Sequence, residues 1–211
     1  GKGDGFLAVP QNLDAFLDVI FSGLDMKISI KTRIGTHYEE DWDYLLDIYE
    51  KYPIHELIIH PRLQIDMYRG VPRLDAFEKA AGRLKMPLCY NGNLFSKEDY
   101  RRIAERFPGT DCFMYGRGLI TNPGLVSELR DGIQPDKAVL RQFHDSLLNE
   151  YEELLSGERN VLFRMKELWS YMAVCFTNSG KYAKKIKKAQ HLSEYQAAVS
   201  SLFAEQDLEC V

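Results

Sequence analysis

Four short runs of apolar, strand-favouring residues each end in polar or charged residues, and they follow one another at nearly even spacing. They are KISIKTRIG at 27–35, ELIIHPR at 56–62, MPLCYNGN at 86–93 and DCFMYGRG at 111–118. The C-terminal strand ends of a (β/α)8 barrel have this character, because the active site is built from those ends and the loops after them. We therefore predict four parallel strands whose C-terminal ends carry the functional side chains.

Helical patterns separate these runs and then continue without further strands. The expected strands are 27–33, 56–60, 87–91 and 111–115, and the expected helices are 12–24 with Asn12 as N-cap, 39–52, 73–84, 96–106, 136–156, 160–178 and 193–205. Strands that alternate with helices at this spacing predict βαβ units and a parallel sheet. The predicted fold class is α/β: the C-terminal half of a (β/α)8 TIM barrel, strands five to eight, in residues 1–133, followed by a small all-helical domain in residues 134–211.

The bulk composition limits the size and class of the protein. The 211 residues are 45% apolar and can form a hydrophobic core, but a complete barrel normally needs about 250 residues. The sequence begins without Met inside a glycine-punctuated motif, so we expect it to be a piece of a longer protein. It shows neither a secretory signal pattern nor an apolar run of roughly 20 residues, so we expect no membrane association.

Charge and cysteine content narrow the function classes further. The formal net charge of −4 excludes a globally basic nucleic-acid binder, so any RNA contact would use local patches. The cysteines lack CxxC spacing, and we expect reduced, buried thiols in a cytoplasmic protein and no metal site. The four cysteines are Cys89, Cys112, Cys175 and Cys210.

The last two strand ends carry residues typical of phosphate binding. Gly116 would let backbone N–H groups approach an anion, and Arg117 would add a charged fork. Asn91, Gly92 and Asn93 close the preceding strand, where Gly92 would allow the same close approach. The alternatives are a tight turn with a surface arginine and an Asn-Gly hairpin, although the helix expected next disfavours a hairpin.

The first two strand ends carry cations and a histidine. Lys31 and Arg33 are two residues apart and so share one face of a strand. Because helices should cover the outside of this sheet, these cations should face the barrel mouth and an electron-rich or anionic partner. His60 ends the next strand, and Arg62 follows two residues later. A neutral imidazole there could bond a cofactor ring, and the alternative is a histidine satisfied within the core.

A basic stretch near the C-terminus, KYAKKIKKAQ at 181–190, is interleaved with aromatic residues. Cations and aromatic rings together suit RNA phosphates and unstacked bases. The alternative is an ordinary solvated helix face.

Together these motifs resemble the tRNA-dihydrouridine synthase family, over essentially the whole chain. SIKTRIG is similar to the family's V-K-x-R-x-G element, IIHPR to H-x-R, YNGN to N-G-D, and MYGRGLITNPGL to M-x-G-R-G-x-x-x-N-P. In the helical part, RMKELWSYM at 164–172 resembles R-x-K-H-x-x-W-Y, and GKGDGFLAVP resembles the segment after the family's catalytic loop. No single element is specific, but five in order at family-like spacing indicate the family.

The resemblance implies an enzyme that uses FMN and NADPH to reduce a uridine in tRNA to 5,6-dihydrouridine. The implied flavin-ring contacts are Lys31 and His60, the implied ribityl-phosphate contacts are Asn91, Gly92, Asn93, Gly116 and Arg117, and the implied base or tRNA contacts are Arg33, Arg62, Arg164, Lys166, Lys181, Lys184 and Lys185. The proton-donating cysteine of the family's N-x-G-C-P loop has no match in this sequence and is expected upstream. Asn93 also replaces the usual Asp, and Glu167 replaces the usual His.

Two other functions stay open from the sequence. One is an FMN-dependent barrel that acts on a free small molecule, although the helical domain and its lysines argue against it. The other is a non-catalytic, RNA-binding remnant, because a half barrel leaves two open sheet edges. We expect the 211-residue chain alone neither to hold FMN tightly nor to turn over, and its oligomeric state is left open.

Overall fold

The computed structural model describes residues 3–209, which form two compact units. The first unit contains the residues up to Asn93 together with Arg101–Tyr115, and the second contains Leu94–Tyr100 together with the residues from Gly116 onward. The domain boundary predicted near residue 133 does not coincide with the division between these units, and it stays a prediction.

The first unit is an α/β layer with four strands. Its elements are η1 (Gly3–Ala8), α1 (Pro10–Gly23), β1 (Ser29–Arg33), α2 (Asp41–Tyr49), β2 (Glu56–His60), α3 (Leu74–Arg83), β3 (Leu88–Asn91) and β4 (Cys112–Met114), with α4 (Lys97–Arg106) divided between the two units. All neighbouring strands pair in parallel in the order β1-β2-β3-β4. Four parallel strands alternating with helices confirm the α/β prediction and are consistent with a partial (β/α)8 barrel.

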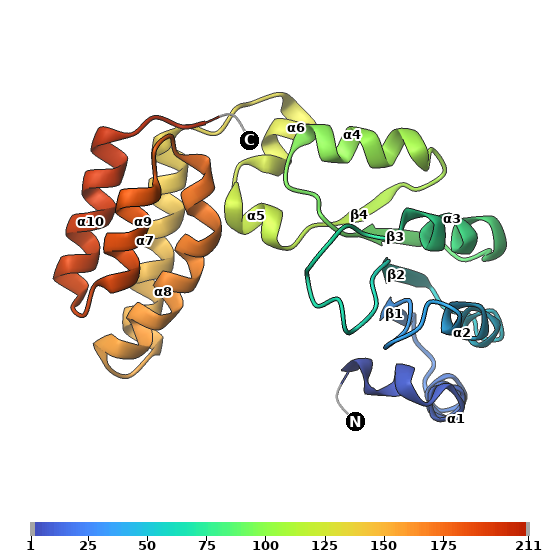
Figure 1. Cartoon of the computed structure of the whole chain (residues 1–211). Coiled ribbons are helices and arrows are strands. Elements are labelled where there is room, and N and C mark those ends of the chain that lie inside the picture. The colour runs from blue at the N-terminus through green and yellow to red at the C-terminus, as the bar shows by residue number, and fades with distance from the viewer. Residues whose placement is uncertain (1–2, 210–211) are drawn as a thin grey trace. The chain divides into compact units, whose positions relative to one another are not determined.

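Helices α1, α2 and α3 lie along one side of these strands (Figure 1). Aromatic residues hold this face together: Tyr49 of α2 donates its hydroxyl to Thr32 of β1 at 2.8 Å. Tyr90 of β3 packs edge-on against Phe77 of α3, with ring centroids 5.2 Å apart. Thr32 and Tyr90 therefore mark the helix-covered face of the sheet.

The opposite face of the sheet carries two rows of side chains, because alternate residues of a strand point to opposite faces. The strand register defines the row of Lys31, Ile58, Cys89 and Cys112, and beyond it the row of Arg33, His60, Asn91 and Met114. In a barrel this face lines the interior, where side chains from neighbouring strands form layers. The second row lies at the C-terminal ends of the strands.

The start of the chain differs from the sequence-based prediction. A 3-10 helix, η1, which was not predicted, precedes the first α-helix. Pro10 begins α1 with Val9 as the N-cap, so the prediction of Asn12 as N-cap was wrong. The physical reason is that proline suits the first turn of a helix, where its missing N–H costs nothing.

The second unit is helical. Its elements are α5 (Arg117–Thr121), α6 (Leu125–Asp131), α7 (Lys137–Leu154), α8 (Glu158–Met172), η2 (Ala173–Cys175), α9 (Gly180–Lys188) and α10 (Leu192–Glu205). The sequence predicted α7, α8 and α10 but continued α8 to residue 178, whereas α8 ends at Met172 and passes into η2. The helices α5 and α6 were not predicted, and α9 lies almost entirely in the stretch 181–190, for which a helix face was only the alternative.

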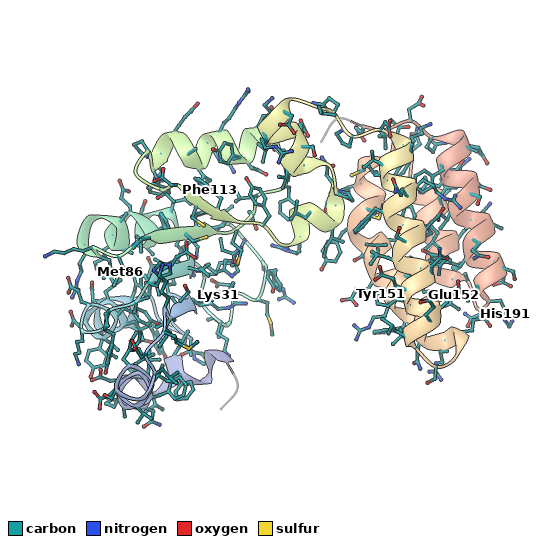
Figure 2. The ribbon with its side chains drawn as sticks, turned by 180° about the vertical axis from the view of Figure 1, so that it is seen from behind. Lys31, Met86, Phe113, Tyr151, Glu152 and His191 are labelled. Carbon is teal, nitrogen blue, oxygen red and sulfur yellow. The ribbon has the colours of Figure 1, made fainter. Side chains whose placement is uncertain are left out.

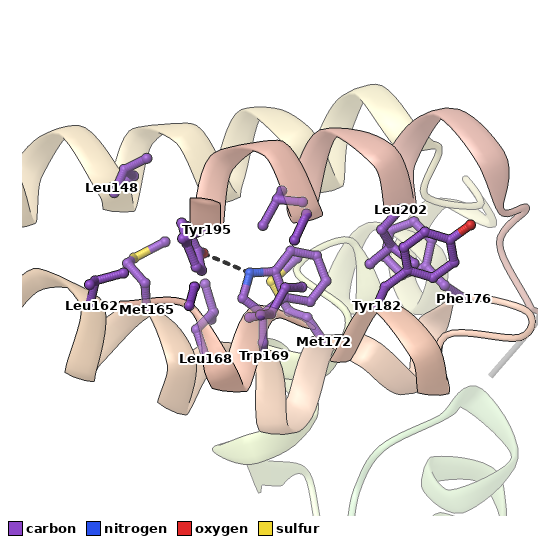
Figure 3. Close-up of a cluster of buried hydrophobic side chains, with 14 of the residues drawn as sticks. Leu148, Leu162, Met165, Leu168, Trp169, Met172, Phe176, Tyr182, Tyr195 and Leu202 are labelled. Atoms are coloured by element: carbon purple, nitrogen blue, oxygen red, sulfur yellow. Dashed lines mark hydrogen bonds between the residues drawn. The ribbon is translucent and has the colours of Figure 1, made fainter. Parts of the chain in front are cut away.

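One hydrophobic cluster unites α7 to α10 (Figure 3). A buried polar chain crosses it: the Trp169 indole donates to the Tyr195 hydroxyl at 2.7 Å, and that hydroxyl lies 2.6 Å from Nε2 of His144. Nδ1 of His144 lies 2.7 Å from the Asp145 carboxylate. If His144 donates from Nδ1 and accepts from Tyr195, every member has a partner while the imidazole is neutral. Leaving one such buried group unsatisfied typically costs about 1–3 kcal/mol.

Membrane insertion finds no support in the described helices. Within residues 3–209, none combines the length and apolar character that a transmembrane span requires.

We predict that the helical unit loses stability in acid through His144. Burial lowers the pKa of His144, against the opposing effect of Asp145. Below the ordinary histidine pKa of about 6.5, the unfolded chain therefore binds a proton that the folded chain resists, so the free energy of unfolding falls as pH drops. Urea unfolding at neutral and mildly acidic pH measures this slope.

The matched variants are His144→Gln and His191→Gln, the second at an exposed histidine. His144→Gln should cost about 1–3 kcal/mol at neutral pH and flatten the acid slope, whereas His191→Gln should leave the slope unchanged. An equal slope in His144→Gln and the unsubstituted chain would show that His144 does not control it.

Candidate active site

The C-terminal strand ends of the first unit bring four of the predicted site residues onto one face. Arg33 pairs with His60 across β1 and β2, and the same register continues from His60 to Asn91 on β3. Lys31 lies one row below on β1, where its side chain is exposed (Figure 2). The predicted shared face of Lys31 and Arg33 is therefore confirmed, and His60 and Asn91 belong to it.

An ordered loop after β2 covers part of this row. Arg33 donates to the backbone oxygens of Leu63 and Met67 at 3.0 and 3.2 Å. Tyr68 lies over the row, with its ring 6.1 Å from the His60 ring and 5.7 Å from the Arg33 guanidinium. Tyr68 was not predicted from the sequence, because its approach to His60 depends on how the loop folds back.

Arg62 holds this loop from inside. The side chain is fully buried and donates to the backbone oxygens of Arg69 and Gly70, the latter at 2.6 Å, and to Oδ1 of Asn93 at 3.2 Å. The sequence suggested Arg62 as a contact to substrate or RNA, and that role stays a prediction. What the geometry adds is a structural role, because the guanidinium joins the loop after β2 to the loop after β3.

An ion pair also fixes the loop after β2. Asp66 accepts a hydrogen bond from the Leu63 backbone at 2.9 Å and pairs with Arg73, which also pairs with Glu39 at 3.0 Å. The Arg73 guanidinium holds the pKa of the Asp66 carboxyl below its usual range. These contacts connect the loops after β1 and β2, so the edge that carries His60 is held from two sides.

The end of β3 is shaped by close backbone packing. Asn91 donates its side-chain amide to the Met114 oxygen at 2.7 Å. A Cβ on Gly92 would lie 3.2 Å from Pro72 and from the Tyr90 hydroxyl. Asn93 adopts a positive φ of 45°, which asparagine tolerates better than most residues. The close approach at Gly92 is thus to protein atoms, and a phosphate role for these residues stays a prediction.

Gly116 and Arg117 begin the longer segment of the second unit, with one residue between them and the end of β4 in the chain. A Cβ on Gly116 would meet no atom within 4 Å, and the Arg117 guanidinium lies 5.2 Å from the Phe95 ring centre. The helix that follows, α5, has only five residues, so few peptide dipoles add up and its N-terminus attracts an anion weakly. Open space at Gly116 and a nearby guanidinium suit an anion, but the helix end adds little.

Gly118 and Asn122 serve the local fold. A Cβ on Gly118 would lie 2.0 Å from the Leu94 oxygen, so no other residue fits there without movement. Buried Asn122 accepts from the Gly124 N–H at 3.0 Å and donates to Glu128 at 3.4 Å.

The predicted tRNA contacts of the helical unit are of two kinds: some side chains contact other protein groups, and others are exposed on α9. Lys166 donates to the Ala189 backbone oxygen at the end of α9, Lys181 lies 3.5 Å from Glu205, and Arg164 lies 3.5 Å from Glu167. Lys184 and Lys185 are exposed on α9, and within residues 3–209 neither makes an ion pair.

Two further exposed lysines, Lys187 and Lys188, belong to the same helix and were not predicted as tRNA contacts. Both lie in the basic stretch 181–190, which is the signal that could have indicated them. Lys185 and Lys188 line a groove of about 380 Å³ against small residues of α10. Its other lining residues are Ala189, Glu194, Ala197, Ala198 and Ser201.

The polar groups of the strand-end face fit one edge of an organic ring cofactor. Among residues 3–209, no group of three or more His, Cys, Asp or Glu side chains could hold a metal ion. One ammonium, one imidazole and one amide on adjacent strands match the carbonyl and ring-nitrogen edge of a flavin. Asn91 offers one such amide and Lys31 an exposed ammonium, so the residues present fit one part of an FMN site.

The fold and this face define a class: an α/β protein built like part of a (β/α)8 barrel, with a polar strand-end site and an appended helical unit. A family model described as dihydrouridine synthase (Dus) matches residues 2–209. The chain therefore belongs to the dihydrouridine synthase family, and the resemblance seen in its motifs is confirmed.

Curated relatives agree with this assignment at low identity. A probable tRNA-dihydrouridine synthase of Staphylococcus aureus (strain Mu50) is 24% identical over 98% of this chain and 63% of its own length. The tRNA-dihydrouridine(16) synthase of Shewanella oneidensis is 28% identical over 69% of this chain and 46% of its own length. The tRNA-dihydrouridine synthase B of Vibrio vulnificus is 25% identical over 60% of this chain and 39% of its own length. The chain thus spans about two fifths to three fifths of these relatives.

We predict that Arg62→Met loosens the loop after β2. The substitution leaves the oxygens of Arg69 and Gly70 without the Arg62 donors, which should lower the cost of local opening by about 1 kcal/mol or more. Trypsin should then cleave after Arg69 at least about fivefold faster. Arg159→Met, at an exposed position on α8, is the control. An unchanged cleavage rate at Arg69 in a folded Arg62→Met protein would contradict the clamp.

Proposed function

We propose that this chain is the part of a flavin-dependent tRNA-dihydrouridine synthase that holds one side of the cofactor and contacts the tRNA. The observation that carries the proposal is the shared strand-end face of Lys31, His60 and Asn91 in a chain of the dihydrouridine synthase family. In this proposal the enzyme reduces uridine in tRNA to 5,6-dihydrouridine, with NADPH as reductant, and acts in the cytoplasm where tRNA is processed.

The residues of this face have separate roles in the proposal. Lys31 stabilises negative charge on the flavin ring, because a cation beside a reduced ring lowers the energy of its anionic form. His60, which is 5% exposed, orients the ring through a hydrogen bond. FMN, when bound, supplies the hydride chemistry; the chain supplies orientation and charge.

Phosphate-binding candidates are assigned in each unit by itself. In the first unit, Gly92 and Asn93 shape the loop after β3, and in the second unit, Gly116 and Arg117 offer open backbone and positive charge. Support for Arg117 comes from guanidinium chemistry, since its planar fork matches two phosphate oxygens. Asn93 contributes through Arg62, to which its side chain is bonded.

The substrate base is assigned to the Arg33 side of the row. Arg33 lies on the same face as Lys31, and its guanidinium is oriented by the Leu63 and Met67 oxygens. Arg62 acts in this proposal through the loop it holds. The proton donor is expected from the family's cysteine loop, to which no segment of this sequence corresponds.

The RNA surface is assigned to the outer face of α9. Tyr182 and Ile186 bury the inner face of this helix in the bundle core, which leaves the lysines outside. Lys181, Lys184, Lys185 and Lys188 follow helical spacing and so share one side. A row of ammonium groups beside the groove on α10 suits successive RNA phosphates.

We predict that deleting the gene that carries this sequence removes dihydrouridine from tRNA. Because family members reduce uridine to this product, nucleoside mass spectrometry of purified tRNA should show a lower dihydrouridine content, and position-resolved sequencing should show loss at a defined site. Restoring the gene should restore the modification. Unchanged dihydrouridine at every position would reject the proposal and favour a barrel enzyme that acts on a small molecule.

Experiments on the purified 211-residue chain distinguish the proposal from the third possibility, a non-catalytic RNA-binding remnant. In the proposal it supplies only part of the flavin site, so the purified chain should not retain FMN through gel filtration. A yellow, active preparation would show that these residues form a complete site. RNA binding combined with normal dihydrouridine in the deletion strain would instead identify a remnant.

We predict that Lys184→Ala with Lys188→Ala weakens binding of the chain to an unmodified tRNA transcript. Each phosphate contact removed should reduce the slope of log K against log salt by about one. Lys51→Ala with Lys79→Ala, two lysines of the first unit in surface ion pairs, is the control. Equal slopes in the two double variants would place the RNA surface elsewhere than on α9.

A further inference from the structure

Two cysteines of different strands lie side by side below the candidate active site. Cys89 of β3 pairs directly with Cys112 of β4 in the parallel ladder. Paired residues project to the same face of a sheet, and neighbouring strands are about 4.7–4.9 Å apart. That spacing lies within the Cα separations of about 4.4–6.8 Å that a disulfide spans, and the bond also requires the two Cβ atoms to approach from about the strand spacing to about 3.5–4.5 Å.

The two cysteines have different access to solvent. An interaction with the Cys112 thiol adds to the effect of burial in raising the pKa of the Cys89 thiol. Cys89 is 1% exposed, whereas Cys112 is only partly buried. The third cysteine of the described residues, Cys175, is buried in the helical unit beside the Thr121 oxygen. A small oxidant therefore reaches the pair through Cys112.

We propose that Cys89 and Cys112 form a reversible thiol–disulfide pair that covalently joins β3 to β4 when the protein meets a low-molecular-weight disulfide. This site is independent of the proposed enzymatic function, because it needs only the two strands and an oxidant of that class.

The exchange is balanced in two steps. The Cys112 thiolate attacks one sulfur of the small disulfide, which breaks the S–S bond and releases one small thiol after protonation. The Cys89 thiolate then attacks Sγ of Cys112, forms the Cys89–Cys112 bond and releases the second small thiol. The two protein thiols are oxidised, their two protons pass to the released thiolates, and the small disulfide is reduced.

The surroundings of the two thiols should make their oxidation slow at neutral pH. Burial is the main cause that raises the pKa of both thiols, and the Glu56 carboxylate adds to the rise at Cys112. Because the thiolate is the attacking species, the reaction should accelerate as the pH rises. In a reducing cytoplasm such a pair stays reduced until the thiol pool is oxidised.

The position gives the bond a consequence for the row above. Asn91 follows Cys89 by two residues, and its side-chain amide is bonded to Met114, which follows Cys112 by two. A covalent bond between the cysteines would fix the spacing of β3 and β4 directly below this contact. Oxidation should thus change the strand ends at which Asn91 lies.

The test is oxidation of the folded 211-residue chain by glutathione disulfide at mildly alkaline pH, followed by thiol counting and alkylation. We expect two of the four thiols to disappear and to return on reduction. Tryptic mapping should show peptide 86–97 joined to peptide 107–117. The rate should rise with pH toward the ordinary thiol pKa of about 8.5 and beyond.

Two single substitutions complete the design. Cys112→Ser, at the partly buried position, should abolish the joined peptides, while Cys175→Ser should leave them unchanged. Four free thiols after oxidation, or a bond that involves Cys175 or Cys210, would overturn the proposal. The mapping of the unsubstituted chain keeps the proposal testable even if Cys112→Ser fails to fold.

Discussion

In-register parallel pairing of four strands is the constraint on which the candidate site depends. A shift of one residue on β2 would turn His60 toward the helices and Ile59 toward the opposite face. The register is fixed on the helix-covered side, where Thr32 bonds Tyr49 and Tyr90 packs on Phe77. The polar row on the other face is therefore a consequence of how well the apolar face packs.

The loops after the strands hold the candidate site residues in place through contacts that strand pairing alone does not provide. Buried Arg62 bonds backbone oxygens of the loop after β2 and the side chain of Asn93 after β3. Arg73 connects the loops after β1 and β2 through Glu39 and Asp66. Guanidinium groups suit this task because several fixed donors can satisfy several carbonyl groups at once. A residue predicted as a ligand contact, such as Arg62, can thus also hold the loops around the site in place.

The helical unit is also held together by buried hydrogen bonds, within a hydrophobic core of its own. Its apolar cluster contains a continuous chain of hydrogen bonds from Trp169 through Tyr195 and His144 to Asp145. The chain satisfies large side chains that could otherwise not be buried, and it orients α7, α8 and α10 with respect to one another. With the inner face of α9 committed to this core, its lysines are left for solvent or an RNA partner.

The sequence by itself determined the order of strands and helices, the shared face of Lys31 and Arg33, and membership of the dihydrouridine synthase family. These follow from local periodicity and from motifs whose residues are neighbours in the chain. The predictions of the N-cap of α1 and of the end of α8 were wrong. Both helix ends depend on the local backbone geometry, at Pro10 and at the turn after Met172.

Only the tertiary structure decided which polar side chains hydrogen-bond other parts of the protein and which face solvent. Arg62 and Lys166 became internal hydrogen-bond donors, Tyr68 came to lie over His60, and Cys89 came to lie beside Cys112. The physical reason is that strand register and loop closure join these residues across eight to twenty-three positions of the chain, and no local pattern in the chain encodes which of them meet.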